Sequence, residues 1–428
     1  MKILLTNVLI MPTPDEEIFN GEVLIDGSKI SYVGKKYLGN IKTDRIIDCK
    51  NNLLTSGFCN AHAHSAMTLF RGVADDLPLK NWLFDKIFPM EDNLTEEDIY
   101  WGTKLAILEY AKSGITAVAD MYFYDNAMVK AYENTGLALA LCSGKNDIGG
   151  GTDSALEYIE SAYLKYSNRD RLKYIMGLHA EYTCSDRLIT GVADLSIKYN
   201  APTYIHLSET LNEVGECSVK RGLTPPQYLH KIGFFDNGGI IAHGTYLDKD
   251  DIDLLKEKNV FCASNPSSNL KLASGVAPVY TMLKRGMKVC LGTDGAASNN
   301  SLSAFKEMYL LSALQKERMK DASCLSAEQT LISATVSGYE ALGFSGGKIK
   351  VGYDADLVLI DLNKPNMRPL NNLKKHLVFS ADTSNVLMTI AGGNIVYENG
   401  NYNVGESVED IYANAEKCIK RLIKQVEK

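Results

Sequence analysis

Five of the seven histidines in this 428-residue sequence lie at or just beyond the ends of short apolar runs that are typical of buried strands. Two of them, His62 and His64, are two residues apart, so both imidazoles would point the same way on extended backbone. Neutral ring nitrogens that converge in this manner suit one divalent metal ion. A lone His-x-His pair also occurs without a metal, so the rest of the sequence has to decide.

The other histidines and one aspartate supply the missing donors. His179, His206 and His243 end later predicted strands, and Asp294 ends another. An aspartate before glycine is also common in turns. Histidine, however, is a poor filler of an apolar core, so a group of them at strand ends indicates ligands or catalysts. Three imidazoles with one carboxylate match an open catalytic site of the zinc type.

Eight strands that alternate with helical segments must position these side chains. The alternation is typical of parallel βα units, and eight units predict an α/β fold with a (β/α)8 barrel whose site lies at the carboxyl ends of the strands. The expected strands are 53–58, 114–121, 137–142, 174–181, 202–207, 239–243, 260–264 and 288–294. The barrel, residues 57–345, is the expected metal-dependent catalytic domain.

The two ends of the chain are rich in strand and turn signals. Residues 1–56 contain an Asp26-Gly27 turn between apolar runs, which indicates a hairpin, but they are too few to bury a core alone. Residues 346–404 have the same texture. We therefore expect 1–56 and 346–404 to form one small β-sandwich, and 405–428 to form a C-terminal helix.

Composition excludes several classes of partner. A net charge of -7 without a Lys/Arg-rich block argues against nucleic acid, and no apolar run approaches the roughly 20 residues of a membrane span. Nine cysteines, an odd number without Cys-x-x-Cys, indicate neither a disulfide framework nor a cysteine metal site. The N-terminal stretch resembles a strand and not a secretion signal. We expect a cytoplasmic protein with a small-molecule partner.

The strand-end pattern resembles the amidohydrolase superfamily, in which the first strand gives His-x-His, the fifth and sixth each give a histidine, and the eighth gives an aspartate. Four runs further resemble the 5′-methylthioadenosine/S-adenosylhomocysteine deaminases, namely 61–72, 206–210, 264–272 and 292–300. The resemblance implies one divalent metal ion bound by His62, His64, His206 and Asp294. Zinc is the expected ion, and iron is the alternative, because both accept imidazole and carboxylate ligands.

The same resemblance implies hydrolytic deamination of adenine nucleosides to the inosine analogue and ammonia, by attack of metal-bound hydroxide on the amine-bearing ring carbon. Asp294 would take the proton of the attacking water and return it to the departing ammonia. Glu209 would protonate the ring nitrogen, although without its neighbours it would be an ordinary loop glutamate. His243 would hold the water or the tetrahedral oxygen.

Glu91 and His179 are implied substrate contacts, with Glu91 accepting from ribose hydroxyls, and Glu209 and Asp294 also face the substrate. Trp82 either packs against the ligand or anchors the loop after the first strand. The loop 143–154 contains Lys145 but no arginine to hold a homocysteine carboxylate. We therefore expect weaker use of S-adenosylhomocysteine than of adenosine, 5′-deoxyadenosine or 5′-methylthioadenosine.

Three other functions remain open. Deaminases of guanine, pterins or triazines share the same metal frame. A cyclic-amide hydrolase normally needs a lysine at the end of the fourth strand to bridge two metals, and 177–181 has none. A non-catalytic metal-binding scaffold would retain ligands without turnover. A homo-oligomer is also open, since barrels of this superfamily often pair.

Overall fold

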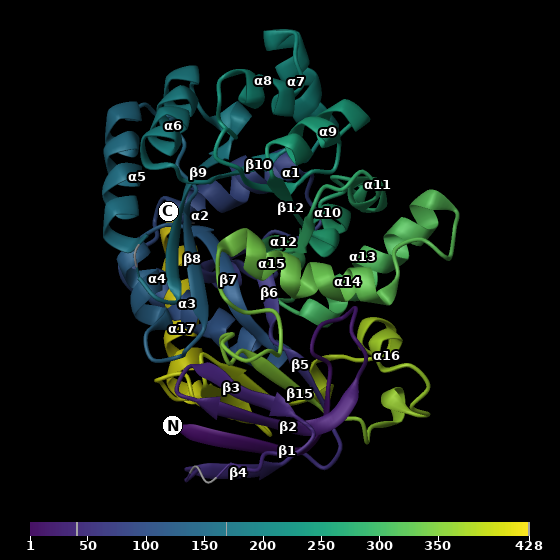
Figure 1. Ribbon diagram of the computed structural model, residues 1–428. Helices are drawn as coiled ribbons and strands as arrows, with labels where there is room; N and C mark the ends of the chain where they lie inside the picture. The colour runs from purple at the N-terminus through teal and green to yellow at the C-terminus, as the bar shows by residue number, and fades with distance from the viewer. Residues whose placement is uncertain (40–41, 168, 427–428) are drawn as a thin grey trace.

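The computed structural model describes residues 1–39, 42–167 and 169–426, and a parallel barrel forms its centre (Figure 1). Its strands follow one another around the barrel in sequence order, and each strand from β6 to β12 is hydrogen-bonded to the next. They are β6 (Phe58–His64), β7 (Ile115–Tyr122), β8 (Ala138–Ser143), β9 (Leu172–Ala180), β10 (Thr203–Leu207), β11 (Gly239–His243), β12 (Val260–Ser264), β13 (Val289–Leu291) and β14 (Asp294–Gly295). The expected barrel is confirmed.

The eighth barrel strand is divided into two short pieces. β13 pairs with β12, whereas β14 pairs with β6 on the other side. Between them, the Gly292 amide donates to the Ser264 carbonyl and the Thr293 amide donates to the His62 carbonyl. The chain thus crosses from one neighbour to the other within a few residues and closes the barrel. This crossing places Asp294 beside the histidines of β6.

The first predicted strand, 53–58, is also two strands. β5 (Leu53–Ser56) belongs to the terminal sheet, and the barrel strand β6 begins only at Phe58. Gly57 separates them at a point where an added Cβ would lie 1.8 Å from Thr116 Oγ1, so no larger residue fits. The apolar residues of β5 serve both cores. Leu53 packs into the barrel-side core and Leu54 into the core of the terminal sheet.

The terminal sheet joins both ends of the chain below the barrel (Figure 1). Its strands run in the order β18-β17-β16-β15-β5-β1-β2-β3, and β4 pairs with β1. Their bounds are β1 (Lys2–Ile10), β2 (Phe19–Asp26), β3 (Lys29–Gly34), β4 (Arg45–Asp48), β15 (Leu357–Ile360), β16 (Val386–Ala391), β17 (Asn394–Glu398) and β18 (Asn401–Tyr402). A separate sheet built from both termini is therefore confirmed, as one continuous hydrogen-bonded sheet that encloses its own core.

Helices follow the barrel strands and cover the barrel. They are α3 (Glu96–Ser113), α4 (Asp125–Tyr132), α5 (Thr152–Tyr166), α6 (Asp186–Tyr199), α7 (Leu211–Arg221), α8 (Pro225–Lys231), α9 (Lys249–Glu257), α10 (Pro266–Lys271), α11 (Val279–Lys284), α12 (Ala296–Asn299), α13 (Ala304–Met319), α14 (Ala327–Ala334) and α15 (Val336–Leu342). Beyond β15 lie α16 (Leu373–Phe379) and α17 (Val408–Val426). Within the described ranges, every helix is too short or too polar to traverse a bilayer.

The segment between β6 and α3 covers the mouth of the barrel. It contains the 3-10 helix η1 (Ser65–Phe70), the short α1 (Leu79–Asn81), the π-helical turn η2 (Trp82–Ile87) and α2 (Phe88–Glu91). The C-terminal helix α17 packs against α3, η1 and α2 through a stripe at helical spacing, formed by Ile411, Ala415, Cys418 and Leu422. Helix α17 thereby packs against the segment between β6 and α3 that covers the barrel mouth.

Candidate metal centre and active site

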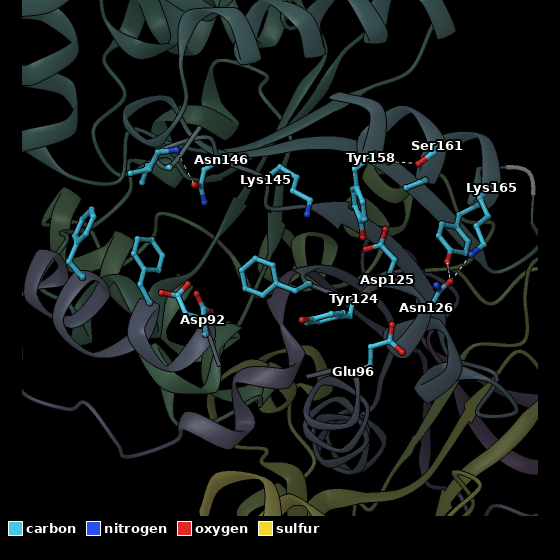
Figure 2. A pocket seen from close by; sticks show the side chains of 18 residues that line it. Asp92, Glu96, Tyr124, Asp125, Asn126, Lys145, Asn146, Tyr158, Ser161 and Lys165 are labelled. Atoms are coloured by element: carbon cyan, nitrogen blue, oxygen red, sulfur yellow. Dashed lines mark hydrogen bonds between the residues drawn. The ribbon is translucent and has the colours of Figure 1, made fainter. Parts of the chain in front are cut away.

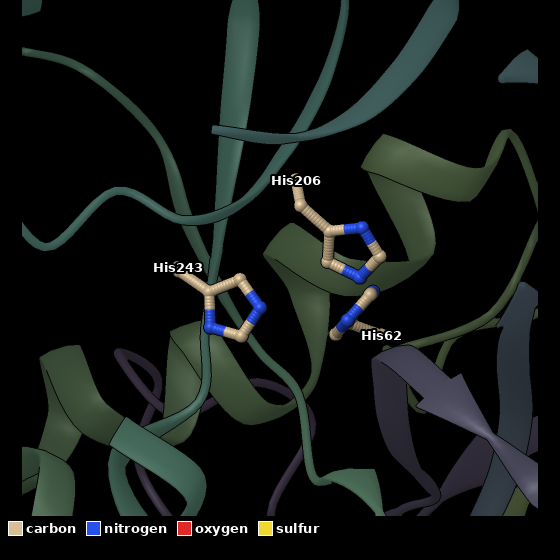
Figure 3. A group of neighbouring side chains, drawn as sticks. All are labelled: His62, His206 and His243. Carbon is tan, nitrogen blue, oxygen red and sulfur yellow. The ribbon is translucent and has the colours of Figure 1, made fainter. Parts of the chain in front are cut away.

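The structure brings the predicted histidines together at the carboxyl end of the barrel. His62 and His64 end β6, His206 lies next to the end of β10, and His243 ends β11. The rings of His62, His206 and His243 face one another with centroids 4.8 to 5.5 Å apart (Figure 3). All four side chains are buried. The period-two alternation of β6 is what points both of its histidines inward.

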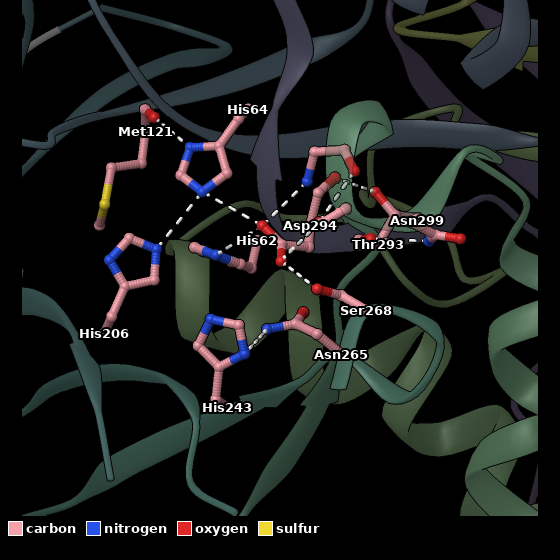
Figure 4. Close-up of polar contacts among 12 residues, drawn as sticks. His62, His64, Met121, His206, His243, Asn265, Ser268, Thr293, Asp294 and Asn299 are labelled. Atoms are coloured by element: carbon pink, nitrogen blue, oxygen red, sulfur yellow. Dashed lines mark hydrogen bonds and ion pairs between the residues drawn. The ribbon is translucent and has the colours of Figure 1, made fainter. Parts of the chain in front are cut away.

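Hydrogen bonds fix which nitrogen of each imidazole faces the centre. His64 Nδ1 lies 2.5 Å from the Met121 carbonyl oxygen (Figure 4), and His206 Nδ1 lies 2.6 Å from the His179 carbonyl oxygen. A carbonyl oxygen only accepts, so both Nδ1 atoms carry the proton. In the neutral rings the lone pairs are therefore on Nε2. These two Nε2 atoms are 3.3 Å apart, a repulsive arrangement that a cation between them would relieve.

His62 is oriented by a tyrosine. The Tyr204 hydroxyl donates to the Ala61 carbonyl at 2.6 Å and so accepts from His62 Nδ1, 3.0 Å away. His62 Nε2 is then the unprotonated nitrogen. It is fully buried and has no hydrogen-bond partner among the described residues. Burial lowers the pKa of His62 to about 3, which keeps the ring in the neutral, ligating form.

Asp294 completes the cluster. Its Oδ1 lies 3.5 Å from His62 Nε2 and 3.2 Å from His64 Nε2. Burial opposes ionisation, but the two imidazoles hold the pKa of Asp294 well below its usual range, and the carboxylate in turn raises the pKa of His64 against the effect of burial. The lowered pKa keeps Asp294 ionised, so an anionic oxygen faces the imidazole nitrogens. Two sets of three donors lie close enough together to hold a cation, namely His62, His64 and Asp294, and His62, His206 and His243.

Two serines and a peptide aim the Asp294 carboxylate. Oδ2 accepts from Ser268 Oγ at 2.5 Å and Ser298 Oγ at 3.0 Å, while Oδ1 accepts from the Gly295 amide at 2.9 Å (Figure 4). The backbone of Asp294 has a φ of 61°, a left-handed conformation that is costly for a residue other than glycine. Such strain is common where tertiary contacts dictate the orientation of a functional group.

Glu209 and His243 lie together on the other side of the cavity. Glu209 Oε1 accepts from Ser274 Oγ at 2.9 Å, and Oε2 is 3.8 Å from His243 Nε2. His243 Nδ1 donates to Asn269 Oδ1 at 2.8 Å, which leaves its Nε2 free to accept from a ligand. The backbone of His243 is also left-handed, with a φ of 73°. An acid and a hydrogen-bonding imidazole therefore stand beside the possible metal ligands.

The predicted substrate contacts line the same cavity. Glu91, His179 and Trp82 face it together with His64, His206, Glu209, His243 and Asp294. Glu91 accepts from the Tyr122 hydroxyl at 2.7 Å, and burial raises its pKa to about 7. The Trp82 indole N–H is buried without a partner among the described residues. An apolar wall formed by Met67, Leu79, Leu83 and Phe88 suits a flat aromatic ligand.

A larger outer cavity of about 920 Å³ adjoins this one and shares Phe88, Glu91, Phe123 and Asn146 with it (Figure 2). Lys145 projects into it, with Nζ 4.0 Å from the centre of the Tyr158 ring. Its charged lining comprises two lysines, Lys145 and Lys165, and four carboxylates, Glu91, Asp92, Glu96 and Asp125. No arginine is among these lining residues. The outer cavity is thus more acidic than basic.

Several side chains that orient the site were not assigned from the sequence. Ser268, Asn269 and Ser274 contact Asp294, His243 and Glu209, and all three lie in or near the quoted run 264–272. A polar run directly after a buried strand is the signal that could have identified them. Tyr204 gave no such signal, because it occupies an ordinary inward position of a strand.

Comparisons with known proteins agree with this geometry. A model of the amidohydrolase family matches residues 53–396. A 5-methylthioadenosine/S-adenosylhomocysteine deaminase of Dictyoglomus thermophilum is 43% identical over 387 residues, 90% of this chain and 91% of that one. A 5′-deoxyadenosine deaminase of Methanocaldococcus jannaschii is 41% identical over 408 residues, covering 94% and 96%. A crystal structure of an adenosine deaminase from Xanthomonas campestris with bound zinc superposes with a TM-score of 0.93 at 29% identity, covering 99% and 98%.

Proposed function

The chain belongs to the amidohydrolase family, and from this premise we propose that it is a metal-dependent deaminase of adenine nucleosides, converting them to the inosine analogue and ammonia. The observation that carries the proposal is the convergence of three Nε2 lone pairs and Asp294 Oδ1 beside Glu209 and His243. Together these supply a cation site, an acid and a hydrogen-bonding imidazole in one cavity.

We assign His62, His64, His206 and Asp294 as the metal ligands, with zinc as the ion and iron as the alternative. A bound divalent ion would lower the pKa of a water toward about 7 and so provide a nucleophile at neutral pH. Asp294 accepts the proton of the attacking water and later passes it to the departing ammonia. His243 Nε2 accepts a hydrogen bond from that water, in keeping with the proton on its Nδ1.

Glu209 acts as the general acid. Its proton goes to the ring nitrogen adjacent to the attacked carbon as negative charge develops there, and the hydroxyl proton on that carbon restores the acid when ammonia leaves. The Ser274 hydroxyl holds the carboxyl group in place. Glu91 accepts from the ribose hydroxyls, His179 contacts the substrate, and Trp82 packs against it with its indole N–H available to a ligand acceptor. The inner cavity then holds the nucleoside and the outer cavity its 5′-substituent.

The acidic balance of the outer cavity supports the expected substrate preference. The described lining offers a homocysteine carboxylate only Lys145 and Lys165 as cationic partners and no guanidinium, beside four acidic groups of which burial raises the pKa of Glu91 to about 7 and that of Asp125 to about 6. Neutral 5′-substituents need no such partner. We therefore propose adenosine, 5′-deoxyadenosine and 5′-methylthioadenosine as better substrates than S-adenosylhomocysteine. Nine buried, unpaired cysteines support a cytoplasmic location.

An ammonia-release screen tests the proposal. Purified protein is assayed against aminated purines, pyrimidines, pterins and triazines, and the metal content of the same sample is measured by elemental analysis. We expect adenine nucleosides to be the best substrates and one divalent ion per chain. A better substrate without an adenine ring would refute the substrate class. Release from no heterocycle at full metal content would favour a scaffold.

A further inference from the structure

A buried carboxylate that the proposed reaction does not use lies directly behind Glu209. Glu213, in the first turn of α7, turns back past the helix N-terminus and accepts from two successive peptide N–H groups. Its Oε1 is 2.6 Å from the Ser208 amide nitrogen, and its Oε2 is 2.8 Å from that of Glu209. Only 4% of Glu213 is exposed. A glutamate at this helix position usually caps the N-cap residue, Thr210, instead.

The backbone N–H groups of Ser208 and Glu209 need the Glu213 side chain as their hydrogen-bond acceptor. Ser208 is buried, and its backbone has a φ of 52°, a left-handed conformation that residues other than glycine rarely adopt. It turns the chain between His206 and Glu209. Without the Glu213 carboxylate, two buried N–H groups in this turn would lose their acceptors, which is costly in a buried turn. The direction in which Glu209 leaves the backbone therefore depends on Glu213.

The Glu209 side chain has few contacts of its own to hold it. Ser274 Oγ donates to Oε1, and His243 Nε2 lies 3.8 Å from Oε2. A shift of the peptide at residue 209 would therefore move the carboxyl group relative to the substrate ring. Misplacement of a catalytic group by about 1 Å costs on the order of 10²-fold in rate.

The same device occurs behind two other parts of the site. Asp120 Oδ1 accepts from the Ser65 amide at 2.9 Å, just after His64. Glu307 Oε2 accepts from the Ser267 amide at 3.0 Å, just before the serine that binds Asp294. Both carboxylates are fully buried. At three places, therefore, a buried acidic side chain accepts from a backbone amide next to a residue of the site.

We propose that Glu213 is a positioning residue for the general acid: its two carboxyl oxygens hold the Ser208 and Glu209 amides and so aim the Glu209 carboxyl group at the substrate. The inference rests on the proposed function, because it assumes the acid role of Glu209. Glutamine at position 213 is the sharpest probe. It keeps the size of the side chain but places an NH2 group against one of the two peptide N–H groups.

The test compares Glu213→Gln with the parent protein and with Glu216→Gln, an exposed change on the same helix. We expect Glu213→Gln to retain the metal and the fold, to lower kcat about 10- to 100-fold, and to change KM less than about threefold. Glu216→Gln should match the parent. The kcat of the double variant Glu209→Gln/Glu213→Gln should be no lower than that of Glu209→Gln alone, because Glu213 acts only by positioning the acid that Glu209→Gln already removes. Unchanged kcat, or losses that multiply in the double variant, would overturn the inference.

Hydrogen–deuterium exchange separates this inference from the proposed function, since it needs no activity. In the metal-loaded protein, the peptide that contains Ser208 and Glu209 should exchange faster in Glu213→Gln than in the parent or in Glu216→Gln. Equal exchange would refute the clamp. A parent protein that deaminates no adenine nucleoside would refute the proposed function, and the exchange result would still report on the clamp.

Discussion

Replacing Glu209 with glutamine should nearly abolish turnover while leaving the metal centre intact. The amide has the same shape, so its oxygen can keep the 2.9 Å contact with Ser274 Oγ. The glutamine side chain, however, cannot give a proton to the ring nitrogen of the substrate. General acids contribute about 10² to 10⁴ in rate, and at about 1.36 kcal/mol per decade their loss raises the barrier by about 2.7 to 5.4 kcal/mol. We expect kcat to fall by that factor and KM to change little.

The assay follows ammonia release from adenosine, with elemental analysis of the same preparation. Metal content should equal that of the parent, because the facing ligand atoms belong to His62, His64, His206 and Asp294 and none is altered. Glu216→Gln, on the exposed side of α7, is the matched control and should keep parental kcat. A Glu209→Gln protein with its metal and with kcat within about threefold of the parent would refute the acid assignment.

Three further results are expected. Among its described lining residues, the outer cavity offers S-adenosylhomocysteine no guanidinium partner, so its kcat/KM should be about 10- to 100-fold below that of 5′-methylthioadenosine. This factor corresponds to the loss of one charged hydrogen bond, about 1.5 to 3 kcal/mol. A preference for S-adenosylhomocysteine would contradict the expectation. Burial raises the pKa of Glu91 to about 7, and only the ionised form offers both oxygens to ribose hydroxyls, so KM should fall as the pH rises through about 7 in the parent but not in Glu91→Gln. Removal of the metal by a chelator should abolish activity. It should also lower the free energy of unfolding, measured by urea titration, by about 2.7 kcal/mol relative to protein in a free metal concentration of 100 times the Kd. The Asp294→Asn variant should behave like the chelated parent.

Prediction from the sequence succeeded where local pattern carries the information. Short apolar runs with intervening helical segments were sufficient to predict the barrel, and strand and turn signals at both chain ends were sufficient to predict the terminal sheet. His62 and His64 converge because alternate residues of one strand share a face. His206, His243 and Asp294 join them because parallel strands end at one edge of a barrel. None of these inferences needs a detailed loop conformation.

Boundaries were less accurate for a physical reason. The run 53–58 is uncharged and has the same pattern whether it serves one sheet or two, so its division at Gly57 between β5 and β6 could not be seen locally. The eighth strand was likewise expected as one piece. Its division into β13 and β14 follows from barrel closure, which depends on neighbours far away in the chain.

The sequence by itself determined the fold class and the donor set, since strand periodicity and residue type are local properties. Only the tertiary structure decided how the donors are aimed: the left-handed turns at Ser208, His243 and Asp294, the acceptors behind each imidazole, and the clamp of Glu213. It also decided that the outer cavity around Lys145 is predominantly acidic. These features arise from contacts between segments remote in sequence, whose energies settle loop conformations that no local pattern specifies.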